Sequence, residues 1–200
     1  GPRGCAGDEV LPVSISRAAR LKTLGLYPRW RLRENHAADI KVSPGTDAGW
    51  TDSGMSPSRH VEAWAKLRED ISRCTRCGLH ASRTQGVPGV GDLCADWLIV
   101  GEAPGAEEDR QGEPFVGQAG KLLDAMLAAI GLKRGEDVYI ANVLKSRPPG
   151  NRDPGPDEVK ACLPYLERQI ELLEPKLILA MGRFAAQSLL ASGESISRLR

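Results

Sequence analysis

The sequence predicts an α/β domain built on a parallel β-sheet. Three short apolar runs are typical of buried strands, at residues 96–100 (DWLIV), 138–143 (VYIANV) and 177–181 (LILAM). Helical patterns lie between these runs, and strands that alternate with helices form parallel sheets through right-handed crossovers. The ligand crevice of such a sheet lies at the carboxyl ends of its strands. We therefore expect a site beside residues 101–105, 145–152 and 182–183.

Apolar spacing and helix-ending residues define the predicted helices. The first helix ends near residue 73 and has an apolar face made of Val61, Trp64, Leu67 and Ile71. The second spans residues 117–130, ends at Gly131, and has a face made of Leu122, Leu123, Met126, Leu127 and Ile130. The third opens at Pro156 and runs to about residue 173, where Pro175 stops it, and a fourth covers residues 183–190.

Composition places the chain among ordinary globular proteins. It has 200 residues, of which 41% are hydrophobic and 26% charged. Its 27 basic and 26 acidic residues leave a formal charge of +1, so it lacks a strongly basic nucleic-acid coat. No apolar run reaches the roughly 18 residues of a membrane span, and we expect no signal peptide because the first residues lack an apolar run. The five cysteines, an odd number, favour a reducing compartment.

Residues 101–120 (GEAPGAEEDRQGEPFVGQAG) form the first motif that points to chemistry. Its glycines and prolines fix a loop whose backbone can come close to a ligand. Gly117 and Gly120 flank a helix start, where free N–H groups favour an anion or an electronegative carbonyl. The motif is neither a Walker phosphate loop nor a Rossmann fingerprint. A plain glycine-rich turn is the alternative, but it leaves the acidic and aromatic residues unexplained.

Residues 142–152 (NVLKSRPPGNR) form the second motif. An asparagine at the end of a strand can present one donor and one acceptor to the edge of a base. Lys145, Arg147 and Arg152 bring positive charge without acidic neighbours, which suits DNA phosphates. A solvated basic loop is the alternative interpretation.

The cysteines form the third feature. The Cys74-x-x-Cys77 spacing is that of a metal or iron–sulfur half-site, and Cys162 lies far along the chain. Cys94 precedes the first strand, where we expect a free buried cysteine, and Cys5 lies in the N-terminal segment.

Together these motifs resemble the family-4 uracil-DNA glycosylases, the iron–sulfur members of their superfamily. The resemblance covers residue 74 to about residue 200 and rests on three segments in order: GEAPGAEEDRQGEPFVGQAGKLLDAML, VYIANVLKSRPPGNRDP and ACLPYLERQIELLEPKLILAMGRFAAQ. It implies a three-layer α/β/α sandwich around a four-stranded parallel sheet. It implies a base-excision repair enzyme that flips uracil out of DNA and hydrolyses its N-glycosidic bond, leaving an abasic site. The segment RLKTLGLYPRWRLRE is similar to N-terminal extensions of some bacterial members, and we expect a cytoplasmic, nucleoid-associated protein without membrane contact. We expect a monomer, because the sequence shows no heptad pattern and no large exposed apolar face.

The resemblance also implies roles for individual residues. Phe115 matches the aromatic residue that stacks on the flipped uracil, and Asn142 the residue that reads its polar edge. Glu108 matches the acidic residue that stands where the methyl group of thymine would lie. Glu102 lies in the motif linked to the catalytic water and the sugar, so Glu102 and Asn142 are the candidate catalytic residues. Backbone N–H groups at Ala103–Gly105 are candidates to bind uracil O2, and Lys145, Arg147 and Arg152 to bind phosphate.

The chain departs from the family at one cluster ligand. Cys74, Cys77 and Cys162 match three of the four cysteines that hold the 4Fe–4S cluster, and Ser146 stands at the fourth position. Serine oxygen is a harder and less acidic ligand than a thiolate. Serine ligation, a three-iron cluster, replacement by Cys94 and loss of the cluster all remain open, and we expect a weakened or incomplete cluster.

A second departure concerns activity and domain organisation. The family carries a downstream H-P-x-x-L-L-R segment with a catalytic histidine, and the three histidines here all precede the first strand. We therefore expect residues 59–200 to be a C-terminally truncated glycosylase domain with little or no activity. Residues 1–58 are expected to be an extension, largely linker, with a short helix at 16–33. The alternatives are a non-catalytic DNA- or partner-binding module of the same fold and a zinc or redox domain built on the cysteine pair.

Overall fold

Three parallel strands form the centre of the structure, a computed structural model that describes residues 57–199. They are β2 (Trp97–Gly101), β3 (Val138–Asn142) and β4 (Leu177–Ala180), as the apolar runs predicted. A two-residue strand, β1 (Val90–Gly91), pairs with β3 in the antiparallel direction, and the strand order is β1-β3-β2-β4. The expectation of a wholly parallel sheet is therefore wrong at this edge. Two residues, one of them a glycine, are too few to show the alternation that predicts a strand.

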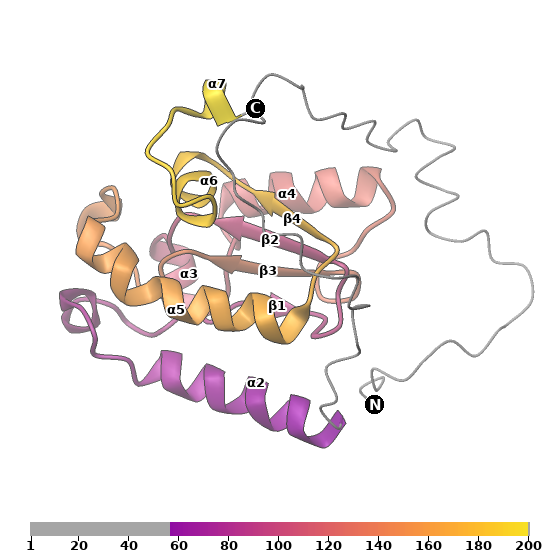
Figure 1. The fold of residues 1–200 in the computed structure, drawn as a ribbon, viewed down its shortest axis with the longest axis horizontal. Helices are drawn as coiled ribbons and strands as arrows, with labels where there is room; N and C mark the ends of the chain where they lie inside the picture. Colours follow the sequence, from indigo (N-terminus) through magenta and orange to yellow (C-terminus); the bar gives the residue numbers. More distant parts are fainter. Residues whose placement is uncertain (1–56, 200) are drawn as a thin grey trace, which may run out of the picture. The chain divides into compact units, whose positions relative to one another are not determined.

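Helices cover both faces of this sheet (Figure 1). Helix α4 (Gln118–Ala129) lies on one side, and α5 (Pro156–Leu173) lies on the other, where α2 (Pro57–Ser72) packs beside it and also reaches the sheet. The predicted three-layer α/β/α arrangement is confirmed. The remaining short helices are α3 (Ala106–Gln111), α6 (Arg183–Leu189), α7 (Ile196–Leu199), η2 (Gly78–Ala81) and η3 (Pro149–Asn151). Helix α2 starts at Pro57, and the helix predicted at residues 16–33 lies outside the described part of the chain.

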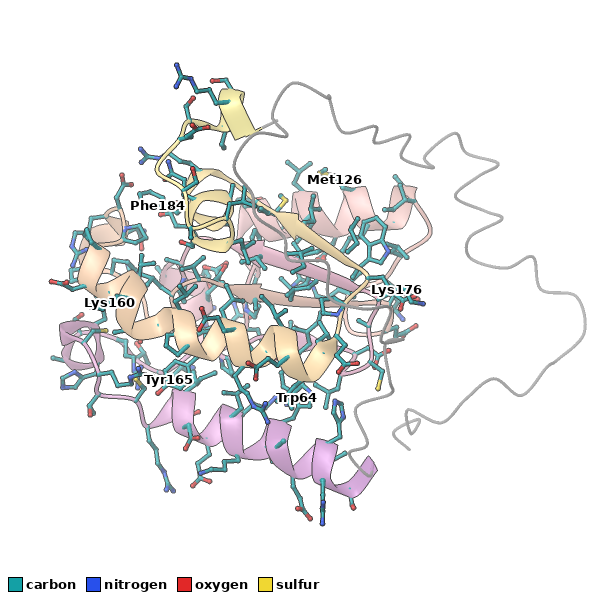
Figure 2. All side chains as sticks on the ribbon, viewed as in Figure 1. Trp64, Met126, Lys160, Tyr165, Lys176 and Phe184 are labelled. Carbon is teal, nitrogen blue, oxygen red and sulfur yellow. The ribbon has the colours of Figure 1, made fainter. Side chains whose placement is uncertain are left out.

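The core follows the two-residue alternation of the strands. On the α4 side, Ile99, Val138 and Ile140 pack against leucines of α4. On the opposite side, the ring of Tyr139 lies 4.9 Å from that of Trp64 between centroids. Figure 2 shows Trp64 rising from α2 toward α5 and the sheet. Alternate residues of one strand therefore belong to different layers, which decides where a side chain at the end of the strand points.

The buried stripes of two helices are narrower than their apolar spacing predicted. Val61 is 60% exposed, Leu122 64% and Met126 52%. Met126 lies on the outer side of α4 in Figure 2. Only the residues directly over the sheet or α5 are buried. Apolar spacing alone therefore predicted a wider buried face on α2 and α4 than the structure has. Among the described residues, no helix is both long and apolar enough to cross a membrane.

Candidate active site

A cavity of about 330 Å³ opens at the carboxyl ends of β2, β3 and β4, where the sequence placed the ligand crevice. Its size falls within the range typical of small-molecule sites. Six residues predicted at a uracil site line it together: Glu102, Ala103, Gly105, Glu108, Phe115 and Asn142. Two lining residues, Ala119 and Met181, were not predicted. Met181 directly follows β4, so it could have been predicted from the rule that ligands bind at the carboxyl ends of parallel strands. Nothing in the sequence marked Ala119 except its place in the first turn of a helix.

Strand register brings the two motifs together. Gly101 of β2 pairs with Asn142 of β3. The pairing continues past the strand ends, because Val143 N donates to Gly101 O at 2.9 Å and Leu144 N to Glu102 O at 3.0 Å. Asn142 lies two residues after Ile140, which packs on the α4 side. The alternation therefore turns its side chain toward the layer that holds α4 and the Phe115 loop.

The missing side chain of Gly101 makes room for both predicted base contacts. A Cβ atom built there would lie 2.4 Å from Asn142 Oδ1 and 2.6 Å from the ring of Phe115. Both distances are far below van der Waals contact. The aromatic face and the amide can therefore approach each other across Gly101, which is the arrangement needed to hold one planar, polar-edged ring.

The amide of Asn142 is buried, with the residue 2% exposed, and lines the cavity. Among the described residues, no hydrogen bond occupies its side chain, although its backbone oxygen accepts one from Lys145 Nζ at 2.6 Å. The amide keeps one donor and one acceptor for a ligand. That pair matches N3–H and O4 of uracil.

The prediction that Lys145 binds phosphate is wrong. Lys145 is 1% exposed, and its ammonium group also donates to Gln169 Oε1 at 2.6 Å. Burial lowers the pKa of Lys145 to about 7. Its charge therefore faces the interior behind Asn142 rather than DNA. The sequence could not show this burial, because the residue that covers the Lys145 ammonium group, Gln169 of α5, lies far along the chain.

The other two basic residues stay at the surface. Arg147 Nε donates to Asn151 Oδ1 at 2.7 Å. Arg152 binds both carboxylate oxygens of Glu158, at 2.6 and 2.9 Å, so much of its charge is neutralised within the chain. The loop therefore offers less positive charge than its three basic residues suggested.

Glu108 joins the two loops that border the cavity. Its Oε1 accepts from the backbone N–H groups of Val116 and Gly117 at 2.9 and 3.0 Å, and its Oε2 accepts from Gly105 at 3.1 Å. The Gly105 amide is thus already used, which corrects its assignment as a donor to a ligand. Because Pro104 has no N–H, Ala103 is the remaining backbone donor of that segment.

Glu102 lines the cavity and interacts electrostatically with two charged residues of opposite sign. Burial raises the pKa of its carboxyl group above the ordinary value, and the negative charge of Asp153 raises it further, while Arg183 opposes the shift. Arg183 and Asp153 pair with each other at 3.2 Å. Such a carboxyl group can exchange a proton at a higher pH than an exposed glutamate.

The three matched cysteines and Ser146 gather beside this site. Cys77 packs against a buried cluster that includes Cys162. Burial raises the pKa of the Cys162 thiol, the charges of Cys77 and Cys74 add to the shift, and a hydrogen bond from the Lys145 backbone opposes it. Arg83 connects Ser146, at the fourth ligand position, to the cysteine loop. Its guanidinium group donates to Ser146 Oγ at 2.6 Å and to Cys74 O at 2.9 Å.

This donor set does not fit a cluster held by four thiolates. It offers three thiols and a hydroxyl group that is 2% exposed and already bound by the guanidinium group of Arg83. Across residues 57–199, no three His, Cys, Asp or Glu side chains are arranged to hold a metal ion. Cys94 does not replace Ser146, because it precedes β2 at the opposite end of the sheet. It is exposed and disulfide-bonded, so the expectation of a free buried cysteine is wrong.

Comparisons with known proteins agree with this geometry. A sequence profile of the Uracil DNA glycosylase superfamily matches residues 88–198. The chain is 57% identical over 127 residues to a type-4 uracil-DNA glycosylase of Archaeoglobus fulgidus, covering 64% of this chain and 63% of the relative. It is 52% identical over 125 residues to that of Pyrobaculum aerophilum (62% and 63%), and 48% identical over 131 residues to that of Thermotoga maritima (66% and 67%).

The chain spans 63% of the length of the first two of these relatives. The matched region contains β2, β3, β4 and every residue that lines the cavity. The chain therefore belongs to the uracil-DNA glycosylase superfamily, in its family-4 branch.

Proposed function

We propose that this chain recognises uracil flipped out of DNA and hydrolyses its N-glycosidic bond, leaving an abasic site. The observation that carries the proposal is the convergence of Phe115, Asn142, Glu108 and Glu102 on one cavity. These residues come from different segments of the chain, and their types match what a planar base with a polar edge requires.

Recognition in this proposal depends on stacking and on hydrogen-bond pattern. A base must leave the DNA stack before an enzyme reaches its glycosidic bond. The ring of Phe115 then covers one face of the base, and such stacking contributes about 1–3 kcal/mol per base. Asn142 bonds N3–H and O4 of uracil and meets the wrong donor pattern on cytosine. Glu108 borders C5, where the methyl group of thymine would collide.

Catalysis follows from charge separation. When the bond between C1′ and N1 breaks, its electron pair stays on uracil and the sugar becomes positive. The N–H of Ala103 then binds the charge that develops at O2. The carboxylate of Glu102 orients a water molecule toward C1′ and takes its proton as the new C–O bond forms. Uracil leaves as an anion that solvent protonates.

Arg147 and Arg152 are the remaining proposed phosphate contacts. Arg152 would exchange Glu158 for phosphate on binding, so its contribution should be the smaller of the two. We also propose that the protein acts as a monomer on DNA within the bacterial cytoplasm.

Uracil release tests the proposal. The 200-residue chain in excess is incubated with labelled single-stranded oligonucleotides that carry one uracil or one thymine, and abasic sites are counted after alkaline cleavage. We expect slow release from the uracil strand alone, and its loss in Asn142→Ala. Uracil-dependent binding without release would instead favour a non-catalytic DNA-binding module. Equal behaviour toward uracil and thymine would contradict the proposal.

For the cysteine site we propose an incomplete iron–sulfur cluster. The Arg83–Ser146 contact takes the place of the fourth ligand bond and connects the cysteine loop to the loop after β3. Iron and sulfide analysis after anaerobic purification should find fewer than the roughly four irons of a complete cluster. Ser146→Cys should raise the iron content, whereas Ser195→Cys, an exposed control, should not. A full complement of iron in the unmodified chain would contradict this proposal.

A further inference from the structure

The loop that carries Phe115 has an unusual backbone. Phe115 has φ = 55°, in the left-handed region that bulky side chains rarely adopt. The loop lies between α3 and α4 without regular structure of its own. Something outside the loop must therefore hold this conformation.

Arg134 binds the loop through its backbone carbonyl groups and does not line the cavity. Its Nη2 donates to Phe115 O at 2.7 Å and its Nη1 to Pro114 O at 2.8 Å. Its Nε donates to Asp124 Oδ1 of α4, also at 2.7 Å. The side chain of Arg134 is 19% exposed. A planar guanidinium group can satisfy three acceptors in this way, because its donors point in fixed directions.

Two further features hold the loop. Glu108 accepts from the N–H groups of Val116 and Gly117, directly after the carbonyl groups that Arg134 binds. Gly120 leaves space for the Phe115 carbonyl group, since a Cβ atom there would lie 1.7 Å from Phe115 O. The loop is thus fixed by a cation at its carbonyl groups and an anion at its N–H groups.

We propose that Arg134, oriented by Asp124, is a positioning residue that sets the ring of Phe115 against the cavity. The inference rests on the proposed function in so far as Phe115 is the stacking surface. Arg134 itself does not line the cavity, so its effect passes through the loop backbone. Without it, the two carbonyl groups lose their donors and the φ angle of Phe115 can relax. The ring would then leave Gly101, and the base would bind a state that is populated only part of the time.

Fluorine NMR can observe this directly, because the chain has two phenylalanines, Phe115 and Phe184. Labelling with fluorophenylalanine gives two resonances, which Phe184→Leu assigns. In Arg134→Gln we expect the Phe115 resonance to broaden and move toward its unfolded position, while the Phe184 resonance stays and reports an intact fold. Arg134→Lys, with a single donor group, should give a partial recovery.

The adjacent Lys133→Ala is the matched control. The side chain of Lys133 is 70% exposed, and among the described residues its ion-pair partner is Glu136, which lies outside the loop. It should leave both resonances unchanged. An unaltered Phe115 resonance in Arg134→Gln would overturn the inference.

A uracil titration separates this inference from the proposed function. Free uracil should move the Phe115 resonance of the unmodified chain, and Arg134→Gln should weaken that binding by about tenfold or more. If uracil leaves the unmodified spectrum unchanged, the proposed function fails while the comparison of the variants still decides the role of Arg134. If uracil binds both proteins equally, the positioning role is wrong.

Discussion

Gly101 is the residue at which the two proposed base contacts meet. Its position in the register with Asn142 is fixed by β2–β3 pairing, and its bare Cα leaves the space that the amide and the Phe115 ring occupy. Its backbone conformation is not in the left-handed region. A side chain is therefore excluded there by space alone.

Gly101→Ala should damage the cavity more than the fold. Forced overpacking typically lowers the free energy of unfolding by about 1–3 kcal/mol, and here the displaced atoms are the ring and the amide of the site. We expect uracil binding to fall below detection in an NMR titration. Gly193→Ala is the control, because a Cβ atom there meets no atom within 4 Å. Equal uracil affinity in the two variants would show that the space at Gly101 is not needed.

The pKa of Glu102 gives a prediction about pH. Its raised pKa means that the carboxylate, the form proposed to orient water, develops at a higher pH than in an ordinary glutamate. The single-turnover rate should therefore rise with pH around that raised pKa. Asp153→Asn removes a negative neighbour and should move the rise to lower pH, and Arg183→Gln removes a positive one and should move it to higher pH.

The exposed Asp70, which pairs with Lys66 on α2, provides a control for this pH experiment. Asp70→Asn should leave the pH profile in place. A shift in the same direction for Asp153→Asn and Arg183→Gln would contradict the assignment of Glu102.

Among the secondary-structure elements, helix α5 supports the end of β3 through hydrogen bonds of Gln169. Gln169 accepts from Lys145 Nζ, and its amide donates to Pro88 O, ahead of β1. Lys145 in turn donates to the Asn142 carbonyl group. A single helix residue therefore connects the strand that bears Asn142 with the antiparallel edge of the sheet.

Gln169→Leu should lower the free energy of unfolding by about 1–3 kcal/mol, because it leaves buried polar groups without partners. Urea unfolding followed by circular dichroism measures this. Glu167→Leu, on the exposed side of the same helix, should change the stability little. Equal stability of Gln169→Leu and the unmodified chain would mean that water or other groups replace the lost contacts.

Local patterns predicted the long elements well and the short ones poorly. The strands β2, β3 and β4 and the helices α4 and α5 have enough residues for apolar spacing to show. Strand β1 and helix α3 do not, and α3 lies within a motif whose glycines favoured a loop. Spacing also could not tell which parts of an apolar stripe another layer covers, as the exposure of Met126 shows.

For the whole molecule, the topology explains why the cavity could be anticipated. Parallel strands end at one edge, so residues directly after β2 and at the end of β3 had to meet there. The contacts behind the site could not be anticipated, because they join segments that are distant in sequence. Arg134 to Phe115 O and Gln169 to Lys145 are examples. Residue type alone made Lys145 look like a phosphate contact and made Gly105 look like a free donor.

Asn142 is the residue proposed to read the base inside this cavity. Asn142→Asp replaces the amide donor of the side chain with a carboxylate oxygen, which accepts a hydrogen bond from the amino group of cytosine instead of donating to uracil O4. A pair of well-formed base contacts discriminates by about 1–3 kcal/mol.

The most direct measurement is the ratio of uracil to cytosine released from matched oligonucleotides, quantified by mass spectrometry for the unmodified chain and for Asn142→Asp. We expect release of uracil alone by the unmodified chain, and a uracil-to-cytosine ratio at least about tenfold lower in the variant. The same ratio in both proteins would contradict this role of Asn142.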